Sequence, residues 1–299
     1  MAYDKSDPRS ALASGAAPKP KTGLIAEPQV GKFYDAEPAL DDAEGSSWFL
    51  RGHNFVLAQT DAKFGGTFTR CDQPDEYVVL LPKHGASIEF GGETQIVPGN
   101  SIVFVPPGDS TVTMPYGGRM FHLFTSRSTD LVSLCPNASA YDAPRSQIPD
   151  FQAWPKPAGG WKLRHYTLDV PKEEGRFGRI FRCTTFMVNV LEPYDGPRDT
   201  TKMSPHHHDE FEQCSLVLQG AYSHHLRWPW TTDMGDWRKD QEIAIGAPSA
   251  TVIPPPVVHT SRATGPEVNA MVDVFCPPRM DFSMKPGWVL NADDYPMPG

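Results

Sequence analysis

Proline is the residue that most constrains the fold of this chain, because 31 prolines are spread over its 299 residues. Proline removes a backbone hydrogen-bond donor and breaks the interior of a helix. The 25 glycines add further turn signals. Helical periodicity is weak throughout, and proline interrupts most candidate helices. The sequence therefore predicts many short strands joined by turns.

Short apolar runs rich in β-branched and aromatic residues supply these strands. The second half of the chain repeats the order of runs and turns found in the first. We expect strands at residues 76–81, 86–90, 93–97, 111–114 and 119–124, and again at 213–218, 221–228, 250–253 and 268–275. Two β-rich halves, joined by a region rich in proline and alanine around residues 135–160, predict tandem domains.

Charge and composition exclude several classes of protein. The net charge is -9 and no basic stripe is present, so we expect no nucleic-acid partner. No apolar run approaches the ~18 residues of a membrane span. The five cysteines are scattered, which favours reduced thiols in a cytoplasmic protein. Residues 1–23 lack hydrophobic periodicity and a secretory signal, and we expect a disordered arm there.

A histidine-rich segment in the second half carries the predicted chemistry. His206 and His208 are two residues apart, so on a strand both rings point to the same face. Gln213 follows, and His259 comes after a later proline corner. Imidazole nitrogens bind divalent transition metals, and we predict that these four side chains hold one metal ion. Glu212 is the alternative to Gln213, because strand alternation turns only one of the two inward.

The first half repeats this scaffold without its histidines. Residues 105–107 before one turn resemble residues 253–255 before the other. Aligned on these corners, the positions of His206, His208, Gln213 and His259 correspond to Thr69, Cys71, Glu76 and Thr111. The sequence therefore predicts a single metal site per chain, in the C-terminal half.

The spacing of the metal-binding candidates resembles the cupin superfamily, and the whole chain resembles a bicupin. The first cupin motif has two histidines, a glutamate and a glycine, which fall here at His206, His208, Gln213 and Gly220. The second motif ends in a histidine, here His259, with Pro256 where the family has glycine. The sequence departs from the family pattern at Gln213 and at Pro256.

This resemblance implies an all-β fold of two tandem cupin barrels of the RmlC-like jelly-roll type. We expect a degenerate N-terminal barrel without metal ligands at residues 24–150. A metal-binding C-terminal barrel is expected at residues 151–299. A homodimer is also an expectation from the family.

The resemblance further implies a metal-dependent enzyme that acts on a small oxygenated molecule, aromatic or carboxylate-bearing. Its sharpest form is a non-haem Fe(II) dioxygenase, so Fe²⁺ is the favoured ion, with Mn²⁺, Ni²⁺ or Zn²⁺ as alternatives. A redox-neutral isomerase or lyase acting on a sugar acid or a similar carbonyl compound is the second hypothesis. It is supported by Gln213, because glutamine is a ligand in some cupins that convert unsaturated uronates. A non-catalytic binding or sensing protein is the third.

Two further side chains are candidates for catalysis. His224 and His225 are adjacent on the predicted strand 221–228, so only one of them faces the barrel interior. We take His225 as the candidate acid or base near the metal. Arg227 is the candidate that holds a substrate carboxylate through two parallel hydrogen bonds.

Overall fold

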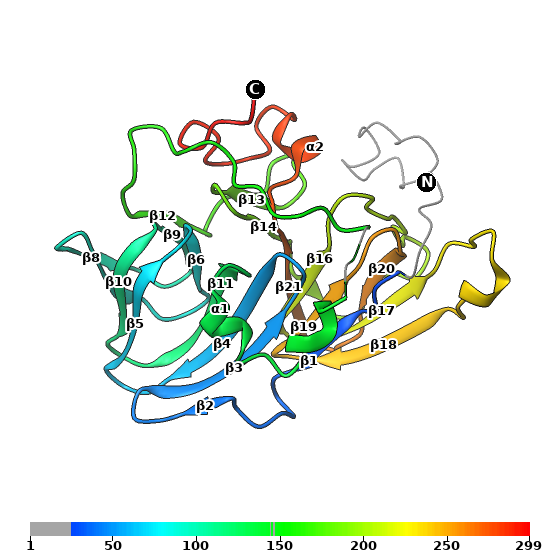
Figure 1. Cartoon of the computed structure of the whole chain (residues 1–299), viewed down its shortest axis with the longest axis horizontal. Helices are drawn as coiled ribbons and strands as arrows, with labels where there is room; N and C mark the ends of the chain where they lie inside the picture. The colour runs from blue at the N-terminus through cyan, green and yellow to red at the C-terminus, as the bar shows by residue number, and fades with distance from the viewer. Residues whose placement is uncertain (1–24, 144, 146) are drawn as a thin grey trace.

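The computed structural model describes residues 25–143, 145 and 147–299, and this part of the chain is almost entirely β (Figure 1). The arm expected at residues 1–23 lies outside the described residues. Within them the helices α1 (Thr129–Val132) and α2 (Met280–Ser283) are single turns, as are the 3₁₀ segments η2 (Ala138–Tyr141) and η3 (Met234–Asp236). The predicted all-β fold is confirmed.

The strands of the N-terminal half form two antiparallel sheets that close around one core as a jelly-roll barrel. The larger sheet has the order β12-β9-β6-β11-β4-β3-β2, and the smaller one β5-β10-β7-β8. Their bounds are β2 (Leu40–Asp41), β3 (Gly45–Arg51), β4 (Phe55–Ala62), β5 (Gly66–Gln73), β6 (Tyr77–Leu81), β7 (Ala86–Phe90), β8 (Glu93–Val97), β9 (Ser101–Val105), β10 (Gly108–Met114), β11 (Gly118–Thr125) and β12 (Arg164–Thr167).

The C-terminal half repeats this arrangement. Its larger sheet has the order β1-β19-β16-β21-β14-β13, with β15 paired to β21, and its smaller sheet is β18-β17-β20. Their bounds are β1 (Gln29–Lys32), β13 (Arg179–Arg182), β14 (Met187–Val190), β15 (Tyr194–Asp195), β16 (Gln213–Gln219), β17 (Ala221–Arg227), β18 (Gln241–Gly246), β19 (Ser249–Ile253), β20 (Val258–Ala263) and β21 (Val268–Phe275).

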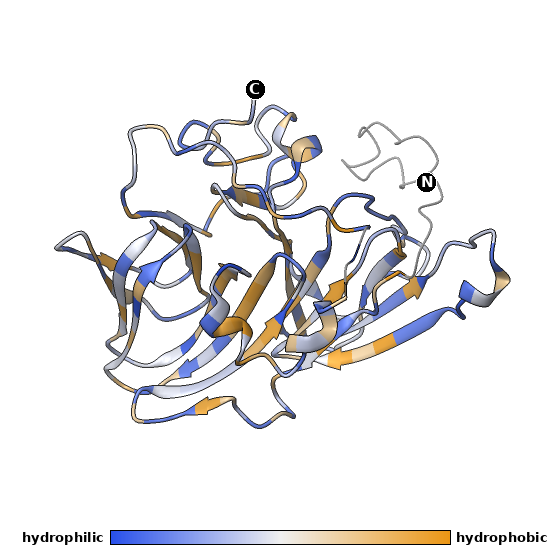
Figure 2. Ribbon diagram, in the orientation of Figure 1, coloured by the Kyte–Doolittle hydropathy of each residue, from blue (hydrophilic) through white to orange (hydrophobic). Residues whose placement is uncertain are grey.

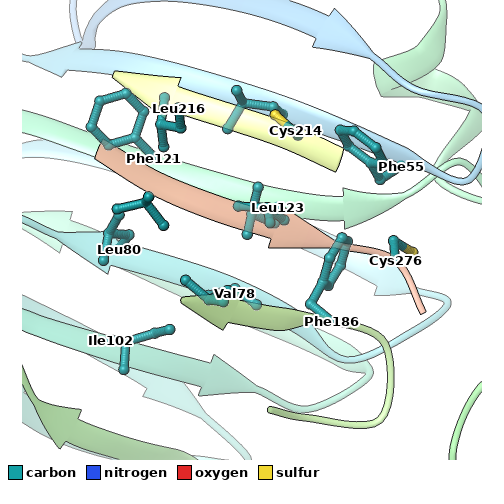
Figure 3. Close-up of a cluster of buried hydrophobic side chains, with 14 of the residues drawn as sticks. Phe55, Val78, Leu80, Ile102, Phe121, Leu123, Phe186, Cys214, Leu216 and Cys276 are labelled. Carbon is teal, nitrogen blue, oxygen red and sulfur yellow. The ribbon is translucent and has the colours of Figure 1, made fainter. Parts of the chain in front are cut away.

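Many of the apolar residues gather on strands at the centre of the molecule (Figure 2). The largest hydrophobic cluster lies there, between the two barrels, where the two large sheets face each other (Figure 3). Strand β6 shows how the sequence builds it. Val78 and Leu80 face the neighbouring barrel, while Val79 and Leu81 face the interior of their own. A strand buried on both faces reads as a continuous apolar run.

The two halves exchange their edge strands. Strand β1 comes from the N-terminal end of the described chain but pairs with β19 of the C-terminal sheet. Strand β12 lies beyond residue 150 but pairs with β9 of the N-terminal sheet. Each exchanged strand covers the backbone groups of a sheet edge that would otherwise be open. Strand pairing therefore crosses the boundary that the sequence suggested near residue 150.

Candidate metal centre

The three histidines predicted as ligands meet inside the C-terminal barrel. His206 and His259 form an isolated antiparallel bridge, in which each backbone N–H donates to the carbonyl of the other (3.0 and 2.7 Å). The rings of His206, His208 and His259 lie 4.4 to 5.4 Å apart between centroids, and all three are buried. One ligand nitrogen from each lies within 4.8 Å of the other two. We call this group the histidine triad.

Backbone carbonyls orient two rings of the triad. Nδ1 of His206 lies 2.9 Å from the Ser204 carbonyl, and Nδ1 of His259 lies 2.9 Å from the Val257 carbonyl. A carbonyl only accepts hydrogen bonds, so both Nδ1 atoms carry the hydrogen. In its neutral form each ring then presents the lone pair of Nε2 to the centre. Burial, aided by Arg279 and the neighbouring histidines, holds the pKa of His208 well below its usual range.

Gln213, the first residue of β16, directs its amide oxygen at the triad. Its Oε1 lies 2.9 Å from Nε2 of His208 and 3.2 Å from Nε2 of His259. The amide nitrogen donates to Oγ of Ser215 and to Oδ1 of Asp273, both at 3.1 Å. Because Asp273 requires a donor, the amide group has one orientation and its oxygen faces the histidines.

This arrangement fits a bound cation. Nδ1 of His259 already donates to a carbonyl, so Nε2 of the neutral ring is an acceptor that faces the amide oxygen of Gln213, 3.2 Å away. Two acceptors at that distance repel each other. A divalent ion bound by both would turn this repulsion into attraction, and imidazole with neutral oxygen is a donor set that divalent metals accept.

Glu212, the alternative ligand, points in the opposite direction. Its carboxylate accepts hydrogen bonds from the Tyr141 hydroxyl (2.6 Å) and from the backbone N–H of His53 (2.7 Å). Both partners belong to the N-terminal half, so Glu212 faces the contact between the barrels. Of the two neighbouring residues, only Gln213 is directed at the histidine triad.

His225 and Arg227 do not line the interior of the barrel, but they line a second pocket whose wall includes His259. On β17 the even-numbered residues face the barrel core, as the burial of Tyr222 and Leu226 shows. His225 is half-buried on the outer face, and Arg227 is exposed and pairs with Asp240. The catalytic role of His225 and Arg227 stays a prediction from the sequence.

His224 is the histidine of the adjacent pair that faces inward. It is fully buried, and its Nδ1 lies 2.7 Å from Oγ of Ser261. Burial and the nearby His259 and His225 lower its pKa to about 3. The ring is therefore neutral at physiological pH and lies beside the triad.

A cavity of about 570 Å³ opens onto the triad. His206, Gln213 and Asp273 contribute to its wall, together with Tyr222 and Ser261 from the small sheet. Burial raises the pKa of the Tyr222 phenol, so this hydroxyl stays protonated and can donate a hydrogen bond. The volume is in the range of pockets that bind small molecules.

Arg198 brings a positive charge to this cavity. Its guanidinium donates to the carbonyl oxygens of Ser261 (3.0 Å) and Lys202 (2.7 Å) and to Oγ of Ser204 (3.1 Å). All of these acceptors are neutral, so they leave the charge of Arg198 uncompensated. Such a group favours a carboxylate ligand.

Strand pairing corrects the alignment of the two halves by one residue. Gln213 pairs with Ile253, and in the N-terminal barrel it is Tyr77, not Glu76, that pairs with Val105. Tyr77 therefore takes the place of Gln213. Its hydroxyl lies 2.9 Å from Oγ of Ser110.

The same shift applies to the histidine positions. Ser110 pairs with Arg70, as His259 pairs with His206. Thr69 and Thr111, the residues aligned from the sequence, pair with each other on the outer face, where their hydroxyls lie 3.3 Å apart. The residues at the positions of His206, Gln213 and His259 are thus Arg70, Tyr77 and Ser110.

Asp273, Arg198 and His224 escaped prediction from the sequence. The sequence could have indicated Asp273, because it is the single charged residue within the apolar strand β21. The sequence could also have indicated His224, since Tyr222 and Leu226 show that its face of β17 is the apolar one. Arg198 follows a turn after β15 and carries no pattern that would place it at the cavity.

No family model and no curated protein matches the chain. Solved structures do. Oxalate decarboxylase of Lactobacillus farciminis, in its formate complex, superimposes with a TM-score of 0.58 at 13% identity, covering 88% of this chain and 90% of that one. Oxalate decarboxylase of Bacillus subtilis at pH 4.6 gives 0.57 at 13% identity, covering 95% of this chain and 85% of that one.

AerE from Microcystis aeruginosa is also similar, with a TM-score of 0.51 at 6% identity, covering 85% of this chain and 99% of that one. At these identities the likeness shows the fold alone. In the described part of the chain no helix has the length and apolar character needed to cross a membrane.

Proposed function

We propose that the chain is a bicupin and that its C-terminal barrel is the active site of a metal-dependent enzyme, and the fold that it shares with oxalate decarboxylases supports this. The proposed substrate is a small carboxylate-bearing molecule. One divalent ion would be held by His206, His208, His259 and Gln213. The observation that carries this proposal is the amide oxygen of Gln213, fixed against two imidazole nitrogens by Asp273.

When bound, such an ion supplies a Lewis acid that polarises a carbonyl or carboxylate oxygen. The four proposed ligands are neutral, so they leave its full positive charge available. In the cavity, Arg198 binds the carboxylate of the substrate and orients it. Tyr222 donates a hydrogen bond to an oxygen on which negative charge develops.

Within this class we favour a redox-neutral lyase or isomerase over the Fe(II) dioxygenase that the sequence suggested first. Iron oxygenases of the facial-triad type use two histidines and one carboxylate. Here the carboxylate of Asp273 binds the amide of Gln213 instead. The similar structures add weight, since they include oxalate decarboxylases, one of them described through its Mn(II) centres.

Metal analysis and anaerobic turnover test the proposal. Protein made without a histidine tag and loaded with Mn²⁺ should hold about one ion per chain. His206→Ala, His208→Ala and His259→Ala should lose it, while His165→Ala, at an exposed histidine of β12, should keep it. Equal metal content in all five proteins would overturn the site.

The reaction class is tested with a panel of small mono- and dicarboxylates under nitrogen. Turnover without oxygen supports the redox-neutral form. Turnover that requires oxygen and consumes it would support the dioxygenase hypothesis instead. Tight binding of a carboxylate without any turnover would support the binding-protein hypothesis. The homodimer and the cytoplasmic location stay predictions from the sequence.

A further inference from the structure

The N-terminal barrel contains a cavity of its own, of about 320 Å³. It lies between the large sheet, strand β5 and the helix α1. Most of its wall is apolar, and four aromatic rings contribute to it, from Phe49, Phe68, Tyr77 and Phe124. An apolar cavity of about 150 Å³ is enough for benzene, so this one has room for a substituted ring.

The cavity occupies the place that the metal centre has in the other barrel. Arg70 and Tyr77, which replace His206 and Gln213 in the aligned halves, both line it. No group of three metal-ligating side chains comes together here among the described residues. The N-terminal barrel therefore has a cavity at the place of the metal centre, lined by different side chains.

Most polar groups around this cavity are already paired. Oγ of Ser47 lies 2.9 Å from Oγ1 of Thr60. The Arg70 guanidinium makes two hydrogen bonds to Asp130 (2.6 and 3.2 Å) and one to Gln73 (2.9 Å). The charge of Arg70 is thus balanced inside the protein, and an additional buried charge from a ligand would find no counter-ion.

His122 is the exception. It is 6% exposed and lines the cavity. Its ring packs on Phe124 (centroids 5.5 Å apart) and near Tyr77 (6.2 Å). Among the described residues no hydrogen bond reaches its ring nitrogens. The ring nitrogens of His122 are therefore available to a ligand in the cavity.

The geometry points to a second small-molecule site in the N-terminal barrel, which binds a neutral aromatic molecule with one hydroxyl group, a phenol, through a hydrogen bond to His122. Burial lowers the pKa of His122 to about 4, so at neutral pH the ring offers one donor and one acceptor. A hydroxyl can pair with either. The proposal does not depend on the metal centre.

Fluorine NMR with 4-fluorophenol tests this site in the full chain. Wild type should bind the probe saturably. His122→Leu should weaken binding about ten-fold, because one hydrogen bond in an apolar cavity is lost. His122→Gln should restore part of it. Ala58→Phe should abolish binding, since Ala58 lines the cavity and a ring there fills it. His165→Leu is the matched control and should bind as wild type does.

Two results would overturn the proposal. One is the absence of saturable binding in wild type. The other is binding that is lost in His259→Ala but kept in Ala58→Phe, which would place the phenol in the C-terminal barrel. Benzoate tests the ligand class, because it has the same ring with a negative charge. It should compete at least ten-fold more weakly than phenol, and stronger competition by benzoate would exclude the neutral class.

Discussion

At the scale of single residues, Asp273 determines which side chain is tolerated beside the histidine triad. Its carboxylate accepts from both Gln213 and Ser215. A glutamate at position 213, the residue that the cupin pattern has there, would place two carboxylates about 3 Å apart in a buried site. Like charges that close cannot both ionise without a large cost.

We therefore predict that Gln213→Glu lowers the free energy of unfolding of the metal-free protein by about 1–3 kcal/mol at pH 7. Saturating Mn²⁺ should restore most of this loss, because the ion offsets the added charge. Urea unfolding with and without Mn²⁺ measures both effects. Gln219→Glu makes the same change at the exposed end of β16. If it proves as destabilising as Gln213→Glu, the account is wrong.

His122 makes stability depend on pH in a defined window. Its pKa is about 4 in the folded chain, against 6.5 for an ordinary histidine. Between these values the unfolded state binds the proton more tightly, so stability is complete above pH 6.5 and is lost as the pH falls toward 4.

The stability of wild type relative to His122→Leu should consequently fall by about 3 kcal/mol between pH 7 and pH 4. Unfolding in urea at a series of pH values gives this difference. His165→Leu, at an exposed position, should follow wild type across the whole range. A difference that does not vary with pH would mean that His122 already has a partner in solution.

The histidine triad was predictable from sequence because each of its constraints is local. A two-residue spacing fixes a shared face, and a proline corner fixes where β20, the strand of His259, begins. The choice between His224 and His225 was not fixed by the histidines themselves. It depended on which face of β17 turns inward. The burial of Tyr222 and Leu226 shows that this is the face of the even-numbered residues.

At the scale of strands, the exchange of β1 and β12 was not readable from the sequence. The pairing of an edge strand uses backbone groups, which are the same in every residue. Strand β1 is four residues long and contains Gly31, so it lacks an apolar alternation that would assign it to one barrel. The residue directly after the strand, Phe33, anchors it, because Phe33 is buried in the hydrophobic cluster between the barrels.

Phe33→Ala should lower the free energy of unfolding by about 3–5 kcal/mol, the usual cost of removing a buried ring. Tyr34→Ala is the matched control, because Tyr34 is adjacent and 46% exposed. It should cost less than about 1 kcal/mol. Denaturant unfolding followed by tryptophan fluorescence measures both variants, and equal losses would show that Phe33 does not anchor β1.

At the scale of the whole molecule, two buried carboxylates tie the barrels together crosswise. Glu76 of the N-terminal half accepts from the Tyr295 hydroxyl (2.7 Å) and from Thr184, both in the C-terminal half. Glu212 of the C-terminal half accepts from Tyr141 in the N-terminal half. Burial raises the pKa of both carboxyl groups, to about 7 for Glu212. The tandem architecture was visible in the sequence, but these ties join residues more than seventy positions apart and leave no local pattern.

Crosswise ties and exchanged strands predict that the two barrels unfold together. Tyr295→Phe removes one donor from the buried Glu76 while leaving the ring in place, and should cost about 1.5–3 kcal/mol, as for a hydrogen bond to a charged group. Tyr141→Phe does the same to Glu212 from the other side and should cost a similar amount. Because both losses fall on one cooperative unit, each variant should show a single unfolding transition, at which tryptophan fluorescence and Mn²⁺ release change together. If Tyr295→Phe instead separates the transition into two, with Mn²⁺ retained through the first, the barrels are independent folding units and the crosswise contacts only align them.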